Sequence, residues 1–276
     1  MPELPDLEYI REFLSSRVIG VAIAELRVLG PIVVRSSDPG RFSNIMRGKR
    51  FKEVRRRGKF LIFSFDSGAL VVINSMLSGR LHYNKIGESG KGKFFLSITL
   101  ENGKEIKYSD ETSMGQIYFL ENEKELDKVP KFTKLGVEAI DPNLSVEKFS
   151  KLIRHFPWEA KNVLTYQTFV AGIGNAYADE ILLDAHISPF KKCNTLSEEE
   201  RTRLYHSMRK VLTVAIETLR ERVGENIHIE IRNFLKIHNK GGQPCPICGT
   251  KISEVSTEGR KTSFCRKCQP GTLFGN

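Results

Sequence analysis

Cys245-Pro-Ile-Cys248 and Cys265-Arg-Lys-Cys268 are two cysteine pairs that determine how the end of the chain folds. The spacing Cys-x2-Cys-x16-Cys-x2-Cys places four thiolates on two tight turns, which is the arrangement of a tetrahedral zinc site. A zinc ion with four protein ligands has no open coordination position, so it stabilises the fold and takes no part in a reaction. We therefore predict one structural zinc ion, bound by Cys245, Cys248, Cys265 and Cys268 in a C-terminal β-hairpin.

Basic residues surround these cysteines. Arg260, Lys261, Arg266 and Lys267 lie between or beside the two pairs, as in a hairpin that contacts DNA. The whole chain has a formal net charge of +10 and a pI near 9.4, which favours a polyanionic partner such as nucleic acid. The charge alone does not decide the point, because many basic proteins bind no nucleic acid.

Length and composition describe a globular protein with more than one domain. Hydrophobic residues make up 40% of the chain and charged residues 28%, which excludes a disordered protein, and 276 residues suffice for two domains with a small appendage. No apolar run is long enough to span a membrane, and the acidic N-terminus lacks the apolar core of a signal peptide. Five cysteines, four of them in the zinc pairs, fit a reducing compartment. We expect a soluble, cytoplasmic protein.

The region before the finger has the pattern of helices. Ser197-Glu-Glu-Glu200 is a capping box that opens a long helix, whose apolar stripe continues to Val223. Further upstream, Gly172-Ile-Gly174 precedes a helix that we expect to begin near Asn175. The free N–H groups of such a helix start can bind a phosphate, although a plain helix start with Asn175 as its cap explains the same residues.

Residues from Val21 to about Phe119 form short β-rich runs instead. Turn signals such as Asp66-Ser-Gly68 and Glu101-Asn-Gly103 separate these runs. Several short strands joined by tight turns predict an antiparallel β-sandwich. The clearest strands are 60–65, 69–73, 94–100, 105–108 and 116–120.

Two segments of this region have both a structural and a functional interpretation. Arg55-Arg-Arg-Gly-Lys59, before the first of these strands, is either a solvated edge that discourages aggregation or a cluster that places Lys59 at a DNA phosphate. Met76 and Leu77 follow another strand, and sequence alone favours a place for them in the core. On an exposed loop of a DNA-binding protein they become candidate wedges between bases.

The chain begins with Met1-Pro-Glu-Leu-Pro-Asp-Leu-Glu8, and apolar positions at helical spacing continue to Val18. Because Pro2 is small enough for Met1 to be removed, the mature chain would begin with a secondary amine. An α-amino group titrates near ~8, so much of it is neutral at neutral pH and can form a Schiff base with a sugar aldehyde carbon. Glu3 and Asp6 supply carboxylates for proton transfer. Taken alone, however, Met1-Pro2 is more simply an ordinary terminus.

In combination and in this order, these features resemble the formamidopyrimidine-DNA glycosylase/endonuclease VIII family over essentially the whole chain. They are the Pro2-Glu3 terminus, the Gly-Ile-Gly-Asn175 turn and the zinc hairpin carrying Gly259-Arg-Lys-Thr262. The resemblance implies an α+β multidomain fold with an N-terminal antiparallel β-sandwich led by a helix (1–130), a helix–two-turn–helix domain (131–239) and a zinc-finger β-hairpin (240–276). It also implies a base-excision-repair DNA glycosylase with abasic-site lyase activity, which excises an oxidised base and then cuts the strand.

The residues that carry this activity in the family have counterparts here. By resemblance, Pro2 is the nucleophile that attacks C1′ of the damaged nucleoside, and Glu3 is the acid that opens the sugar ring. Lys59, in Arg-Gly-Lys-Phe-Leu, matches the family's catalytic lysine near the phosphate. Asn175 and Arg260 match the residues that bind the DNA phosphates.

Two departures from the family pattern bear on the substrate. Members that excise oxidised guanine carry the stretch Asp-Pro-Arg-Arg-Phe. Its arginine pairs with the orphaned base, and its phenylalanine fills the void that the extruded base leaves. The matching stretch of this chain reads Asp110-Glu-Thr-Ser-Met-Gly115, without either residue. The segment from about 220 to 242 is also short for the loop that caps an oxidised purine. We expect Met76, Leu77 and Met114 to fill the void. Oxidised pyrimidines, ring-opened purines and abasic sites should then be processed better than 8-oxoguanine.

The expected partner is double-stranded DNA containing oxidised bases or abasic sites. We expect a monomer, associated with the nucleoid in a bacterial cytoplasm. Two rival interpretations are a catalytically reduced damaged-DNA-binding protein of the same fold and a zinc-ribbon nucleic-acid module with an unrelated sandwich. The joint presence of Pro2, Glu3 and Lys59 favours the enzyme.

Overall fold

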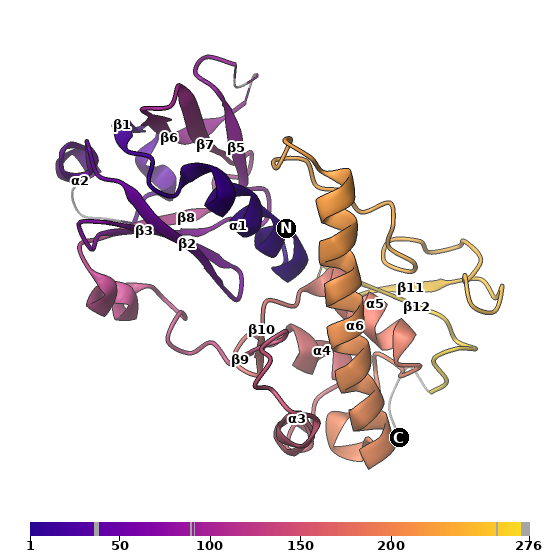
Figure 1. The fold of residues 1–276 in the computed structure, drawn as a ribbon. Helices are drawn as coiled ribbons and strands as arrows, with labels where there is room; N and C mark the ends of the chain where they lie inside the picture. Colours follow the sequence, from indigo (N-terminus) through magenta and orange to yellow (C-terminus); the bar gives the residue numbers. More distant parts are fainter. Residues whose placement is uncertain (36–38, 89, 91, 258, 272–276) are drawn as a thin grey trace. The chain divides into compact units, whose positions relative to one another are not determined.

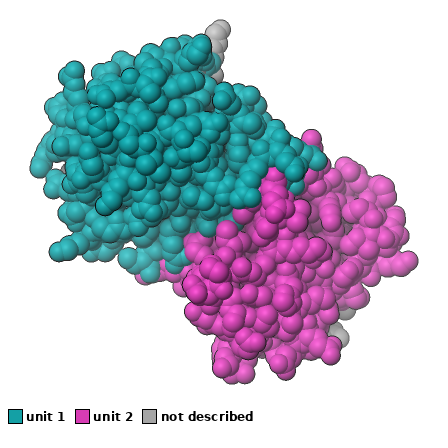
Figure 2. Space-filling model, in the orientation of Figure 1, with its two compact units in different colours: residues 1–133, 218–231 teal, residues 134–217, 232–276 magenta. Residues whose placement is uncertain are grey.

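The computed structural model describes residues 1–35, 39–88, 90, 92–257 and 259–271 (Figure 1). The chain divides into two compact units (Figure 2). The N-terminal unit comprises Met1–Thr133 and Thr218–Ile231, and the C-terminal unit comprises Lys134–Glu217 and Arg232–Asn276. The stretch Thr218–Ile231, which contains the end of the longest helix and the segment after it, therefore belongs with the N-terminal unit, although the residues on both sides of it belong with the C-terminal unit.

The N-terminal unit is an antiparallel sandwich of two four-stranded sheets, led by helix α1 (Leu4–Val18). Two short 3₁₀ helices, η1 (Pro31–Val33) and η2 (Glu123–Lys128), and helix α2 (Pro39–Met46) complete it. One sheet has the order β1 (Ile23–Val28), β6 (Phe94–Leu100), β7 (Lys104–Ser109), β5 (Arg80–Lys85), and the other has the order β2 (Phe51–Arg57), β3 (Phe60–Phe65), β4 (Leu70–Asn74), β8 (Gln116–Leu120).

The apolar run at 60–65 becomes β3, in which all six residues are buried. It pairs with β2 on one side and β4 on the other, with Phe63 opposite both Val54 and Val71. A strand covered on both faces needs apolar residues at every position, which explains why the sequence shows no alternation there. Helix α1 packs against β2 and β3 and buries Leu4, Leu7 and Leu14.

The basic cluster belongs to a strand that the sequence did not indicate. Arg55–Arg57 precede β3, as predicted, and form the end of β2, which is the edge strand of its sheet. Val54, within β2, is buried, but three consecutive arginines follow it, so the sequence lacks the apolar alternation of a strand.

The C-terminal unit is mainly helical and carries the finger at its end. The short strands β9 (Val137–Glu138) and β10 (Val170–Ala171) are parallel, and β11 (Ser253–Thr257) and β12 (Arg260–Phe264) form the antiparallel hairpin of the finger. The remaining elements are α3 (Val146–Ile153), α4 (Ala160–Thr165), α5 (Asn175–Asp184), the 3₁₀ helix η3 (Cys193–Thr195) and α6 (Glu198–Arg222), which starts in this unit and ends in the other.

The predicted capping box at the start of α6 is present. The Ser197 hydroxyl accepts a hydrogen bond from the Glu200 N–H at 3.2 Å, and the Glu200 carboxylate accepts one from the Ser197 N–H at 2.9 Å. The α+β architecture that the sequence predicted, a helix-led antiparallel sandwich followed by helices and a β-hairpin, is confirmed. None of the helices in the described part of the chain has both the length and the apolar character needed to cross a lipid bilayer.

Candidate functional site

The amino terminus is held rigidly by the first turn of α1. Glu3 occupies the N-cap position, and its N–H donates to the Asp6 carboxylate at 2.8 Å. The Glu3 carboxylate in turn accepts the N–H of Asp6, so the two residues form a reciprocal capping box. Pro2 and Glu3 are both buried, whereas Met1 is exposed. The chain is therefore packed into the fold from Pro2 onward, unlike an ordinary exposed terminus.

Lys59 lies at the tip of the hairpin between β2 and β3. Gly58 and Lys59 form its two-residue turn, and Gly58 has φ +55°, a conformation that glycine adopts without strain. The Arg56 guanidinium donates to the Gly58 carbonyl at 3.1 Å and so fixes the turn from within. Lys59 is half-buried there.

An ion pair connects this hairpin to the first helix. Arg56 Nε donates to the Glu8 carboxylate at 2.7 Å, and both side chains are largely buried. Burial alone would raise the pKa of Glu8, but the charge and hydrogen bonds of Arg56 and Arg11 lower it below its usual value. The sequence did not indicate this contact, because Glu8 and Arg56 lie in separate elements. The ion pair positions the Lys59 turn against α1, the helix that directly follows Pro2 and Glu3.

The residues expected to fill the void lie on two loops of the N-terminal unit that are bonded to each other. The Ser78 hydroxyl contacts the Asp110 carboxylate and lies 2.8 Å from the Thr112 hydroxyl. Asp110 also accepts the N–H of Gly115 at 2.6 Å, which closes the 110–115 loop around its buried carboxylate. Burial opposes ionisation of Asp110, but these hydrogen bonds lower its pKa. The loops 75–79 and 110–115 are thus joined into one structure.

Three apolar side chains project from these joined loops. Leu77 is 49% exposed and Met114 is 45% exposed, while Met76 is half-buried in a left-handed conformation with φ +47°. The core position that the sequence favoured is therefore wrong for Leu77. Apolar side chains exposed on polar loops are the form that a wedge between bases requires.

In the C-terminal unit, α5 begins at Asn175, as the sequence predicted. Gly174 is the N-cap, so Asn175 is not the cap that the simpler interpretation assumed. Instead, its side-chain amide donates to the Lys261 carbonyl of the finger hairpin at 2.8 Å. Arg260, the residue before Lys261, is the first residue of β12 and is exposed. The structure therefore brings Asn175 and the Arg260 end of the hairpin together.

A buried charge network supports this contact. Lys161 Nζ lies 2.6 Å from Asp179 Oδ1, and the two side chains are 7% and 0% exposed. Lys161 also donates to the Lys261 carbonyl at 2.6 Å, the same oxygen that Asn175 reaches. The other Asp179 oxygen lies 2.8 Å from His238 Nδ1. Sequence reasoning missed this network, although an acidic pair in the otherwise apolar helix at 176–183 was a signal that could have revealed it.

Glu180, next to Asp179, holds the segment that leads into the finger. Its carboxylate accepts the backbone N–H groups of Lys236, Ile237 and His238 at 2.8, 2.8 and 2.9 Å. A carboxylate that receives three N–H donors fixes the path of that backbone. Asp179 also accepts the N–H of Ser263 in β12 at 3.3 Å, so helix α5 anchors both the hairpin, through Asp179, and the approach to it, through Glu180.

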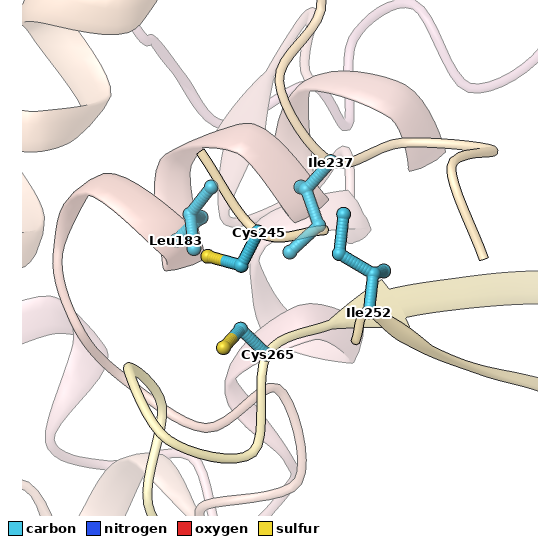
Figure 3. Close-up of a cluster of buried hydrophobic side chains, with 5 residues drawn as sticks. All are labelled: Leu183, Ile237, Cys245, Ile252 and Cys265. Atoms are coloured by element: carbon cyan, nitrogen blue, oxygen red, sulfur yellow. The ribbon is translucent and has the colours of Figure 1, made fainter. Parts of the chain in front are cut away.

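The four predicted cysteine ligands come together at the end of the hairpin. All four sulfur atoms lie within 4.8 Å of one another, with Cys245–Cys268 at 3.8 Å and Cys248–Cys265 at 3.5 Å. A tetrahedral site with Zn–S bonds of about 2.3 Å needs sulfur atoms about 3.8 Å apart, so the cluster fits one structural zinc ion. Cys245 and Cys265 lie beside Leu183, Ile237 and Ile252 (Figure 3). This apolar packing connects the metal site to α5.

Three family models match the chain in order. The formamidopyrimidine-DNA glycosylase N-terminal domain matches residues 1–117, the formamidopyrimidine-DNA glycosylase H2TH domain matches 135–226, and the zinc finger found in FPG and IleRS matches 242–271. A formamidopyrimidine-DNA glycosylase from the bacterium Pelotomaculum thermopropionicum is 33% identical to this chain, covering 98% of this chain and 99% of the relative.

Solved structures match over the same extent. The Lactococcus lactis Fpg in complex with DNA containing an abasic site has a TM-score of 0.87 at 26% identity and covers 98% of this chain and 100% of that one. The same protein in complex with DNA containing FAPY-dG has a TM-score of 0.88 at the same identity and coverage. The three parts of the predicted fold, the sandwich, the helical region and the four-cysteine finger, are thus confirmed.

Proposed function

The chain belongs to the formamidopyrimidine-DNA glycosylase family, and from that premise we propose that it excises oxidised bases from double-stranded DNA and then cuts the strand at the abasic site. The observation that carries the proposal is the order at the amino terminus, where Pro2 is buried directly beside the capped Glu3. Once Met1 is removed, a secondary amine and a carboxyl group lie side by side in a fixed geometry, which is what nucleophilic and acid–base catalysis require.

Pro2 and Glu3 divide the first steps between them. The amine nitrogen of Pro2 attacks C1′ of the damaged nucleoside while the C1′–N bond breaks, and the base leaves with the bonding electrons and takes up the proton that the amine nitrogen loses. Glu3 protonates the ring oxygen, so that the sugar opens and the C1′ carbon forms an iminium with Pro2. The positive iminium makes the C2′ proton acidic, and its loss expels the 3′ phosphate. Loss of the C4′ proton from the conjugated iminium that remains then expels the 5′ phosphate. Hydrolysis of the imine returns the free amine.

The remaining residues bind the DNA strand. Lys59, on the turn fixed by Arg56, neutralises a backbone phosphate with its point charge. Asn175 and Arg260 bind phosphates from the C-terminal unit, where the Lys261 carbonyl keeps the Asn175 side chain against the hairpin. The zinc ion would be held by the four cysteines and would keep the hairpin folded.

The substrate range follows from the joined loops 75–79 and 110–115. Extruding a nucleotide leaves a hole and an unpaired partner base, at a cost of a few kcal/mol. Leu77 and Met114 are exposed and apolar, so with Met76 they fill the hole. Thr112 and Ser113 are too short to hydrogen-bond the partner base as an arginine would, and such a contact contributes about 1–3 kcal/mol of discrimination. Discrimination between opposite bases is therefore weak.

The test is a panel of duplex oligonucleotides that carry single lesions, each placed opposite all four bases. We expect single-turnover excision of oxidised pyrimidines and ring-opened purines, and cleavage of abasic sites, to be faster than excision of 8-oxoguanine. Rates should vary little with the opposite base. Fast release of 8-oxoguanine with a strong preference for cytosine opposite would contradict the substrate range, and DNA binding without cleavage of any lesion would indicate a catalytically reduced binding protein instead.

A further inference from the structure

Residues 224–231, here called the return segment, follow α6 and lie on the N-terminal unit. The Tyr9 hydroxyl donates to the Gly224 carbonyl, and Ile227 is buried. The His228 ring stacks on His82 of β5, with ring centroids 4.4 Å apart and an angle of 16° between the planes. The segment is thus fixed on the sandwich at its start and middle, and its course brings Glu230 to the amino terminus.

Glu230 uses its two carboxylate oxygens for different partners. Oε2 forms an ion pair with the Arg80 guanidinium at the start of β5, while Oε1 lies 3.6 Å from the nitrogen of the Met1 amino group. Arg80 is itself held by a hydrogen bond to the Gly79 carbonyl at 2.8 Å. The Glu230 and Arg80 side chains are only 23% and 22% exposed, so solvent screens their charges incompletely. One oxygen therefore fixes the carboxylate, and the other faces the terminus.

Removal of Met1 leaves this arrangement beside the new amine. The nitrogen atoms of Met1 and Pro2 are three bonds apart, which is at most about 4 Å. The Glu3 and Asp6 carboxylates are engaged with each other's backbone N–H in the capping box. We propose that Glu230, held by Arg80, is a positioning residue that accepts a hydrogen bond from the amine of Pro2 and orients it. The proposal rests on the proposed function, since it takes Pro2 as the nucleophile.

This role has an electrostatic consequence that a purely structural role lacks. An anionic carboxylate near the amine favours its protonated form and so raises the pKa of the Pro2 amine, while the Arg80 cation opposes this effect. Other titratable groups on the elements around the terminus include Glu3 and Asp6 in the first turn of α1, His82 on β5 and His228 on the return segment. Only the neutral amine attacks C1′, so the acidic limb of the rate–pH profile reports the pKa of this amine.

The experiment measures single-turnover formation of the borohydride-trapped adduct on abasic-site DNA between pH 5 and 9, using full-length protein that begins at Pro2. In Glu230→Gln the side chain keeps its shape and loses its charge, so the acidic limb should move to lower pH by about half a unit to one unit. In Arg80→Gln the cation that offsets the charge of the Glu230 carboxylate is removed. The pKa of the Pro2 amine should therefore rise, and the acidic limb should move to higher pH. Glu225→Gln is the matched control, because Glu225 is in the return segment but pairs with Arg17, and its profile should match the wild type.

Shifts in opposite directions for the two variants would support the inference. An acidic limb that stays in place in both variants would overturn it, even if their rates are lower at every pH, because a general loss of structure lowers the rate without moving the limb. Zinc content and thermal unfolding identify a variant that fails to fold, and the other variant then decides. Absence of an adduct on Pro2 in the wild type would instead refute the proposed function, so the two failures are distinct.

Discussion

The polar contacts around Pro2 differ in kind from those around Asn175 and Arg260. In the N-terminal unit, the amino terminus is reached by the partly exposed carboxylate of Glu230. In the C-terminal unit, Asn175 shares its carbonyl partner with Lys161, whose ion pair with Asp179 is almost fully buried. That ion pair joins α4 to α5, and the other contacts of the network hold the finger hairpin or the segment leading to it.

The difference corresponds to the role that we propose for each region. A nucleophilic amine must exchange protons and receive a substrate, and a partly exposed partner such as Glu230 suits that need. A phosphate-binding surface needs only a fixed position, and paired buried charges provide it. Their disadvantage is that the loss of either partner leaves a buried charge without compensation. The C-terminal unit should therefore tolerate substitution of its network poorly, whereas substitutions near the amino terminus should change rates and pH dependence more than stability.

The largest effect is expected at the zinc site. Cys265→Ser removes one of four ligands, and because structural zinc contributes on the order of 10 kcal/mol to the folding of small fingers, the hairpin should unfold and DNA binding should weaken by more than tenfold. Metal analysis should find zinc lost, and fluorescence anisotropy with labelled duplex DNA should report the affinity. A variant with full zinc content and normal affinity would contradict the four-thiolate assignment.

The buried ion pair should give the next largest effect. Lys161→Met leaves the Asp179 carboxylate buried without its cation, which should lower the free energy of unfolding by about 3–5 kcal/mol in urea titrations followed by circular dichroism. Lys210→Met is the matched control. It removes an exposed lysine of α6 that pairs with Asp184, which lies on α5 as Asp179 does, and it should lower the free energy of unfolding by at most about 1 kcal/mol. Equal losses in the two variants would show that burial does not distinguish them.

Arg260→Ala should have a smaller effect, confined to DNA binding. Arg260 is exposed and makes no contribution to the metal site, so the variant should keep its zinc and its melting temperature. Its affinity for DNA should fall about tenfold, and the slope of log K against log salt should become shallower by about one unit because one phosphate contact is lost. An unchanged salt slope would mean that Arg260 does not contact a phosphate.

The smallest expected effect is the pH dependence of the stacked histidines. Burial, the neighbouring His228 and the charges of Lys107 and Arg80 lower the pKa of His82 from 6.5 to about 4. The unfolded chain therefore takes up a proton at this position before the folded chain does, so stability should decrease as the pH falls from about 6.5 to about 4 and not further below. The melting temperature of the wild type should fall more between pH 7 and pH 5 than the melting temperature of His82→Gln. An equal fall of the melting temperature in both proteins would show that groups other than His82 cause the pH dependence.

The sequence predicted those parts of the fold and site that depend on neighbouring residues. The cysteine spacing, the capping box at Ser197 and the start of α5 at Asn175 are local patterns, and all three are present. Leu77 was misjudged because an apolar residue after a strand looks the same whether the following loop is buried or exposed. Strand β2 was missed because its last three residues are arginines, which hide the apolar alternation.

The contacts between distant residues could not be predicted. Arg80 and Glu230 are 150 residues apart, and their ion pair exists only because the return segment folds back onto the sandwich. Lys161 and Asp179 lie on different helices, and nothing in the spacing of a lysine and an aspartate distinguishes a buried pair from two exposed charges. Glu8 and Arg56 likewise meet only through the packing of α1 on β2.

The central claim is that the amine of Pro2 is the nucleophile, and peptide mapping of the trapped adduct tests it most directly. Purified protein should begin at Pro2, and sodium borohydride should reduce the Schiff base to a stable cross-link with abasic-site DNA. Mass spectrometry of the digest is expected to place the sugar remnant on the N-terminal peptide, at Pro2. A remnant on Lys59 or on any other lysine, with Pro2 unmodified, would contradict the account.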